Sequence, residues 1–215
     1  MELTCTAVLF DVDGTLLDST AAVERAWRVW AAEYGVDIDA LLRNHHGVRT
    51  EETVAYFLPP ELREAAVARL DALELADDGD IVPIPGAARL LAGLPPDRWA
   101  VVTSGTVPLA TSRMAAAGLP WPPVAVTAES IPAGKPDPAC YLLAASKLGV
   151  PATGCLVVED APAGVRAGKA AGATVLGLTT SHPAAALDGA DYVLPSLAAV
   201  RMEAVDDGVR VTLGD

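Results

Sequence analysis

The chain has 215 residues, of which 52% are hydrophobic and 20% are charged, and its formal net charge is −13 at pH 7. This apolar content suffices for the core of one globular domain, or of one domain with a smaller insertion, and excludes a wholly disordered chain. No apolar run reaches the roughly 20 uncharged residues of a membrane helix, so we expect no membrane-spanning segment. Such an acidic surface repels phosphate backbones and anionic lipids, which disfavours a nucleic-acid or membrane partner.

Three cysteines, Cys5, Cys140 and Cys155, occur at spacings that do not match a metal site. An odd number of widely separated thiols favours reduced, buried side chains over a disulfide framework. The first residues also lack the basic start and the cleavage region of a secretion signal. We therefore expect a cytoplasmic protein. Nothing in the sequence specifies an oligomeric state.

Short apolar runs rich in β-branched residues alternate with helical stretches along most of the chain. The runs predicted to be strands are 6–10, 99–103, 155–158 and 174–177, with shorter candidates at 124–126 and 192–194. The stretches predicted to be helices are 85–94, 107–117, 139–148 and 163–171. Continuous apolar strands that alternate with helices are typical of βαβ units, so we predict an α/β fold with a Rossmann-like, doubly wound parallel sheet.

One region interrupts this alternation, because residues 17–82 contain no convincing strand. Val23, Trp27, Trp30 and Tyr34 recur there at helical spacing, which favours packing of the aromatic rings over a ligand platform. We predict a helical insertion at 17–83, between a first core segment at 1–16 and a second at 84–215. The final stretch, 202–215, is either an edge strand or a loose tail.

Polar residues stand at the carboxyl ends of the predicted strands or in the loops that follow. Asp11 and Asp13 come directly after the first strand, separated by one residue and followed by Gly14 and Thr15. In open α/β sheets this edge is where ligands bind. Clustered carboxylates repel one another and need a cation or a shared proton, and hard oxygen ligands suit Mg²⁺. The motif therefore predicts a magnesium site.

Three further polar groups are expected at the same edge. Thr103 and Ser104 precede Gly105 and offer hydroxyl and amide donors to an anion. Lys135 follows Gly134 and precedes Pro136 and Pro138. The two prolines would stiffen the loop and so hold the Lys135 ammonium in place. Glu159 and Asp160 supply two more carboxylates after the strand at 155–158. Any one of these groups could be a helix cap or a solvated loop charge, but four at one edge favour an active site.

Together the motifs resemble those of the haloacid dehalogenase-like superfamily of phosphohydrolases. The matching residues are Phe10-Asp11-Val12-Asp13-Gly14-Thr15, Thr103, Lys135 and Glu159-Asp160. The resemblance covers nearly the whole chain and implies a Rossmann-like core with a small α-helical cap, here the insertion. Shorter signals, at 46–50 in the insertion and at 179–183 near the end, are similar to glycerol-3-phosphate and 2-deoxyglucose-6-phosphate phosphatases. They imply a small sugar or polyol phosphate as the substrate.

The resemblance also implies the roles of the site residues. Asp11 would be the nucleophile that forms an aspartyl-phosphate, which splits one difficult step into two. Asp13 would protonate the leaving alkoxide and later deprotonate the attacking water. Mg²⁺ would be held by Asp11, the Asp13 backbone carbonyl and Asp160, with Glu159 acting directly or through water. Lys135 would pair with both Asp11 and the phosphate.

The remaining expected contacts involve the substrate. Thr103 and the amide of Ser104 would donate to phosphate oxygens. In the cap, Arg49 and then His46 are the expected contacts beyond the phosphate, although both could instead be solvated surface residues. The cap would close over the site and exclude water.

The same fold also carries functions other than phosphate hydrolysis, and the sequence bears on three of them. A haloacid dehalogenase needs no second motif aspartate, so Asp13 disfavours that activity. A phosphosugar mutase of the β-phosphoglucomutase type would share Asp11 and Asp13. Known mutases of that type rely on a lysine in the cap, and here no lysine precedes Lys135, which disfavours the mutase. Phosphate release without a bisphosphate activator would separate the phosphatase from the mutase. A non-catalytic phosphate-binding or regulatory module is the alternative of another class.

Overall fold

The computed structural model describes residues 1–42 and 48–214. Its central feature is a six-stranded sheet in which every neighbouring pair of strands is parallel. In spatial order the strands are β6 (Ala125–Val126), β5 (Trp99–Val102), β2 (Ala7–Phe10), β7 (Cys155–Glu159), β8 (Thr174–Leu178) and β9 (Tyr192–Leu194). The chain therefore starts in the middle of the sheet and winds outward in both directions. The predicted doubly wound α/β fold is confirmed.

The sheet is covered on both faces, as the continuous apolar strands predict. In β2, Val8 and Phe10 belong to the hydrophobic cluster on one face, whereas Ala7 and Leu9 belong to the cluster on the other. This follows from the two-residue period of a strand. The helices of the core are α5 (Ala87–Gly93), α6 (Val107–Ala116), α7 (Ala139–Lys147) and α8 (Pro162–Ala170). The first two pack on the Val8 face and the last two on the Leu9 face.

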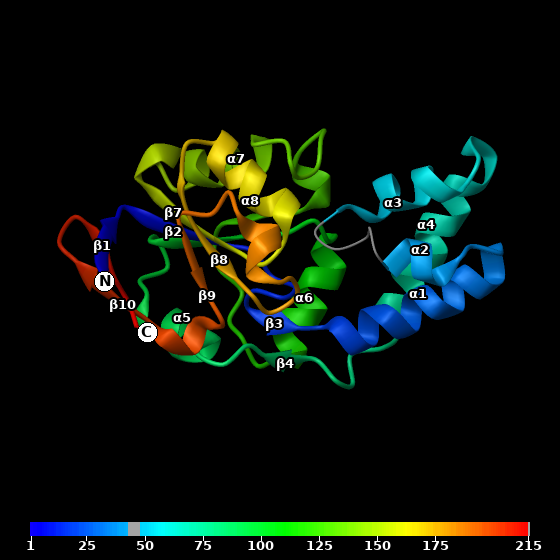
Figure 1. The fold of residues 1–215 in the computed structure, drawn as a ribbon, viewed down its shortest axis with the longest axis horizontal. Coiled ribbons are helices and arrows are strands. Elements are labelled where there is room, and N and C mark those ends of the chain that lie inside the picture. Colours follow the sequence, from blue (N-terminus) through cyan, green and yellow to red (C-terminus); the bar gives the residue numbers. More distant parts are fainter. Residues whose placement is uncertain (43–47, 215) are drawn as a thin grey trace.

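The end of the chain forms a strand and not a loose tail, but this strand lies at the centre of a small sheet and not at an edge. Strand β11 (Gly208–Leu213) lies between β1 (Glu2–Cys5) and β10 (Val200–Val205) in a separate antiparallel sheet. The amino group of Met1 donates to the Leu213 carbonyl at 2.8 Å. This sheet packs on the same cluster as Phe10 and lies far from the helical insertion (Figure 1). Two of its strands, β1 and β10, have no counterpart among the predicted elements.

The insertion is helical and forms its own hydrophobic cluster. Its helices are α1 (Thr20–Tyr34), α2 (Ile38–Leu42), α3 (Thr50–Phe57) and α4 (Pro60–Leu75). Trp30 is fully buried in this cluster and its Nε1 donates to the Ala66 carbonyl at 2.8 Å. Figure 1 shows these helices as a group beside the core.

Two short strands join the insertion to the core. β3 (Leu17–Asp18) and β4 (Val82–Pro83) pair antiparallel at the two points where the chain leaves and re-enters the core. The prediction that 17–82 contains no strand is therefore wrong at both ends. Backbone pairing here holds the two connections side by side, so they enter the insertion together. Among the described residues, no helix combines the length and apolar content needed to cross a membrane.

Candidate active site

The loop after β2 places Asp11 at the carboxyl edge of the sheet. The Asp11 amide donates to the Val158 carbonyl of the neighbouring strand at 3.0 Å, so the side chain leaves the strand at a fixed point. The loop then turns at Gly14, whose φ is +84°. A Cβ at this position would overlap the Asp160 carboxylate. Glycine is therefore needed both for the turn and for the close approach of Asp160.

Lys135 reaches the same point from the loop before α7 and is almost completely buried. Its Nζ lies 2.6 Å from Asp11 Oδ1, 2.6 Å from Glu159 Oε1 and 3.2 Å from the Val102 carbonyl. Burial lowers the pKa of Lys135, but the charges of Asp11 and Glu159 raise it by more, so the net shift is upward. Lys135 is therefore a fixed ammonium between two carboxylates.

Glu159 is the last residue of β7, Asp160 follows it, and both are also buried. Glu159 Oε1 accepts a hydrogen bond from the Tyr141 hydroxyl at 2.6 Å, and Oε2 accepts the Asp160 and Ala161 amides at 3.2 and 3.3 Å. The Ser181 hydroxyl donates to Asp160 Oδ2. One side chain from a distant part of the chain thus orients each carboxylate, Tyr141 for Glu159 and Ser181 for Asp160.

The acidic residues fit a bound divalent cation. Asp11, Glu159 and Asp160 each offer one oxygen, and these atoms lie within 4.8 Å of one another. Burial raises the pKa of Asp11 to about 7, although Lys135 opposes this shift. Burial, and then the charge of Asp11, also raise the pKa of Asp160. One ammonium does not balance three buried carboxylates, so this donor set suits a hard cation such as Mg²⁺.

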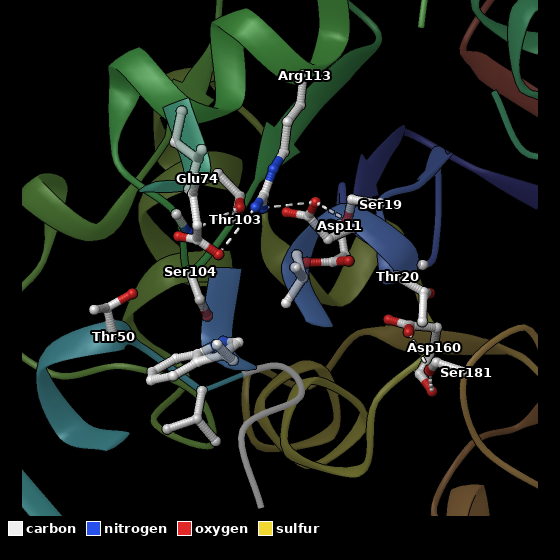
Figure 2. Close-up of a pocket in the computed structure, with 17 residues that line it drawn as sticks. Asp11, Ser19, Thr20, Thr50, Glu74, Thr103, Ser104, Arg113, Asp160 and Ser181 are labelled. Carbon is white, nitrogen blue, oxygen red and sulfur yellow. Dashed lines mark hydrogen bonds and ion pairs between the residues drawn. The ribbon is translucent and has the colours of Figure 1, made fainter. Parts of the chain in front are cut away.

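The Asp13 carboxylate lies outside this group and faces helix α6. Its Oδ1 accepts hydrogen bonds from the Ser19 hydroxyl at 2.6 Å and from Arg113 Nη1 at 2.9 Å. Arg113 Nη2 in turn donates to Glu74 Oε1 on α4 at 3.1 Å. Figure 2 shows Arg113 and Glu74 pointing toward one another at the side of the pocket. Asp13 is thereby connected to the insertion through a buried arginine.

A pocket opens between the sheet edge and the insertion. Thr103, which is 4% exposed, and Ser104 line it from the loop after β5, and the Thr103 hydroxyl accepts the Gly105 amide at 3.0 Å. Asp11, Asp13 and Asp160 line it from the core. The structure thus places the predicted aspartates and the predicted anion-binding loop around one cavity, with Lys135 directly behind Asp11.

The structure describes one of the two predicted cap contacts, Arg49. Arg49 Nη2 donates to the Ile131 carbonyl at 2.8 Å, so its side chain reaches the core loop that precedes Lys135. Its neighbours Val48 and Thr50 line the pocket. His46 lies outside the described residues.

Five residues around the site have no counterpart among the predicted site residues. They are Ser19, Glu74, Arg113, Tyr141 and Ser181. Of these five residues, only Ser181 lies in a segment with a sequence signal, because 179–183 is similar to glycerol-3-phosphate and 2-deoxyglucose-6-phosphate phosphatases. The other four occur in helices, or next to one, at positions whose local pattern predicts only packing or exposure.

The fold and the buried acidic cluster define a hydrolase of the haloacid dehalogenase type. The family described as haloacid dehalogenase-like hydrolase matches residues 5–172, and the chain belongs to this family. The predicted resemblance is confirmed.

Curated relatives and solved structures agree over most of the chain. It is 44% identical to hexitol phosphatase A of Escherichia coli (strain K12), over 90% of this chain and 92% of the relative. It is 36% identical to 2-deoxyglucose-6-phosphate phosphatase 1 of Saccharomyces cerevisiae, over 93% and 91%. A hydrolase from Pseudomonas syringae has a TM-score of 0.82 at 27% identity, over 90% of this chain and 94% of that one.

Proposed function

We propose that the protein is a Mg²⁺-dependent phosphatase that hydrolyses a small sugar or polyol phosphate through a phosphorylated Asp11. The observation that carries the proposal is the contact of 2.6 Å between Lys135 and Asp11, buried at the sheet edge beside Glu159 and Asp160. A nucleophilic carboxylate needs a nearby cation to approach an anionic phosphoryl group, and this arrangement supplies one.

Asp11 would attack the phosphorus atom in line with the leaving oxygen. Its Oδ1 is engaged by Lys135, which leaves Oδ2 for the attack. Thr103 and the Ser104 amide would donate to the phosphoryl oxygens from the loop after β5. Lys135 would contact the same phosphoryl group, because its ammonium lies against Asp11 and the carboxylates around it raise its pKa.

Asp11, the Asp13 backbone carbonyl and Asp160 would hold the magnesium ion, with Glu159 acting directly or through water. When bound, Mg²⁺ offsets the repulsion between carboxylate and phosphate and stabilises charge on the phosphoryl oxygens. The burial that raises the pKa values of Asp11 and Asp160 supports this assignment, because a bound cation would stabilise both carboxylates in their charged form.

Asp13 would be the general acid and then the general base. Ser19 and Arg113 both bind its Oδ1, so Oδ2 can face the leaving oxygen. In the first step Asp13 would give a proton to the leaving alkoxide. In the second step it would take a proton from the water that hydrolyses the aspartyl-phosphate.

The insertion, 17–83, would act as a cap on the core formed by 1–16 and 84–215. The pairing of β3 with β4 at its two ends supports these boundaries. Arg49 would secure the closed cap through its contact with the Ile131 carbonyl, and His46 stays a predicted substrate contact. The sugar and polyol substrates in the relatives' names support the substrate class.

A cytoplasmic location is also proposed. It is supported by Cys5, Cys140 and Cys155, all of which are free and buried. Burial raises the pKa of each thiol, to about 12 for Cys5 and about 11 for the other two, which keeps them protonated at neutral pH. Buried thiols without disulfides suit a reducing compartment.

The test is a panel of phosphorylated metabolites assayed for phosphate release with Mg²⁺ and with EDTA. We expect turnover of sugar and polyol monophosphates without any bisphosphate activator, and its loss in EDTA. Release only in the presence of a bisphosphate would identify a mutase instead. No release from any phosphomonoester with Mg²⁺ would identify a non-catalytic module.

A further inference from the structure

Glu74 and Arg113 form a buried ion pair between the insertion and the core. Glu74 lies in the last turn of α4 and is 7% exposed, and Arg113 lies on α6 and is 5% exposed. Burial raises the pKa of Glu74, against the opposing charge of Arg113. Removing one partner of a buried ion pair leaves the other charge uncompensated, so Glu74 and Arg113 hold each other in position.

The pair lines the pocket next to the proposed proton donor. Arg113 contacts Asp13 through Nη1 and Glu74 through Nη2, and all three residues line the same cavity. Figure 2 shows Arg113 and Glu74. If Asp13 protonates the leaving oxygen, the carbon chain attached to that oxygen extends past Asp13. The groups beyond it are therefore placed to contact this chain.

The chemistry of this part of the pocket suits a neutral hydroxylated chain. Val23, Trp27 and Leu109 supply apolar surface for C–H groups. The Glu74 carboxylate can accept hydrogen bonds from hydroxyls. Arg113 Nε is buried and has no hydrogen-bond partner within 1–42 and 48–214, so one donor of the guanidinium is unused.

The same part of the pocket is unfavourable for a second anion. Glu74 carries a negative charge there, Asp13 carries a second one whenever it does not hold the proton that it transfers, and Arg113 is the one cation among the residues that the structure shows lining the pocket. Arg113 already contacts both carboxylates. A terminal carboxylate or a second phosphate would therefore meet the buried Glu74 carboxylate, with no cation among these residues left to pair with it.

We propose that Glu74 is a specificity-determining residue, which with Arg113 selects phosphomonoesters with a neutral hydroxylated chain and rejects those with a second anionic group. This rests on the proposed phosphatase function and specifies its substrate class. Because Glu74 belongs to α4 and Arg113 to α6, the selection exists only when the insertion lies against the core.

The test compares two substrates that differ only at the far end. Glucitol 6-phosphate ends in a CH₂OH group, and 6-phosphogluconate has the same six-carbon chain ending in a carboxylate. We expect the wild-type protein to have a higher kcat/KM for glucitol 6-phosphate. In Glu74→Gln this preference should fall by about tenfold, mainly through a lower KM for 6-phosphogluconate, because one repelling charge is removed.

The control is Glu64→Gln, since Glu64 lies on the same helix and is exposed. It should keep the wild-type preference. Loss of packing alone in Glu74→Gln would lower both kcat/KM values equally and leave their ratio unchanged, and that result would overturn the proposal. If Glu74→Gln does not fold, Glu74→Asp keeps the charge and should still reject 6-phosphogluconate; failure to do so would overturn it as well.

A third substrate separates this inference from the proposed function. Phenyl phosphate has no hydroxylated chain. Its hydrolysis by the wild-type protein with Mg²⁺, combined with equal kcat/KM values for the two six-carbon substrates, would overturn the role of Glu74 alone. No phosphate release from any of the three, nor from the wider panel of phosphorylated metabolites with Mg²⁺, would overturn the phosphatase function and this inference together.

Discussion

The edge of the core sheet and the helical insertion both line the pocket, but they are built differently. At the sheet edge, Asp11 and Asp160 directly follow neighbouring strands, so backbone pairing fixes their positions. On the insertion, Glu74 is positioned by the packing of α4 against α1 and α3 and by its contact with Arg113. Strand ends can therefore fix the positions of the reacting groups. The packed helices of the insertion can carry different side chains toward the rest of a ligand without changing the sheet edge.

The largest expected effect is at the sheet edge. Asp11→Asn removes the proposed nucleophile and should lower kcat by at least about 10³-fold. Asp13→Asn should also lose most turnover but keep magnesium affinity, measured by titration calorimetry. The control is Asp206→Asn, at an exposed position outside the pocket. Near-normal phosphate release by Asp11→Asn would show that another group attacks the phosphorus.

The second prediction concerns the space behind the acidic cluster. A Cβ on Gly164 would overlap the Glu159 carboxylate, which holds both Lys135 and Tyr141. Gly164→Ala should therefore displace Glu159 and lower kcat/KM by about 10²-fold, an effect comparable to a misplaced catalytic group. The control is Gly79→Ala, because a Cβ there meets no atom within 4 Å. Unchanged activity in Gly164→Ala would mean that Glu159 does not position Lys135.

The third prediction tests whether the insertion has its own stability. Trp30 is fully buried and is hydrogen-bonded to the Ala66 carbonyl. Trp30→Ala should cost about 3–5 kcal/mol through loss of burial and a new cavity. The control is Val29→Ala, since Val29 is 44% exposed.

Hydrogen exchange locates this loss. Amides of α1 and α4 should exchange faster in Trp30→Ala, while those of β2 and β7 should keep their protection. Equal acceleration in both regions would show that core and insertion unfold as one unit.

The smallest expected effect lies on the core surface. Asp191 contacts Lys169 at 2.7 Å and accepts the Val175 amide at 2.8 Å. Burial raises the pKa of Asp191, but these two donors lower it by more. Because the folded-state pKa lies below the unfolded one, the stabilisation is present at neutral pH and is lost as the pH falls through the folded value.

Asp191→Asn should therefore destabilise the protein by no more than about 1 kcal/mol at neutral pH, since the pair is partly exposed. The difference from the wild-type protein should shrink in acid. Urea unfolding at neutral pH and at about pH 3 measures both, with exposed Asp188→Asn as the control. A difference that grew in acid would contradict the assigned direction of the pKa shift.

How far the sequence predicts each region follows from the range of the interactions. The strand carrying Phe10 and the acids after it are predicted because a continuous apolar run and its polar end are adjacent in sequence. The Glu74–Arg113 pair joins residues 39 positions apart, through a helix packing that no local pattern encodes. Strand β1 is missed for the same reason, since its partner, β11, is remote from it in the sequence.

The position of Trp27 has a practical consequence. Its indole is 4% exposed, lines the pocket, and lies 5.3 Å from the ring of Trp30. A molecule that enters the pocket changes the surroundings of this chromophore, so its intrinsic fluorescence reports occupancy without any label. Trp27 is the one tryptophan among the residues that the structure shows lining the pocket, and Trp30, Trp99 and Trp121 supply the background emission.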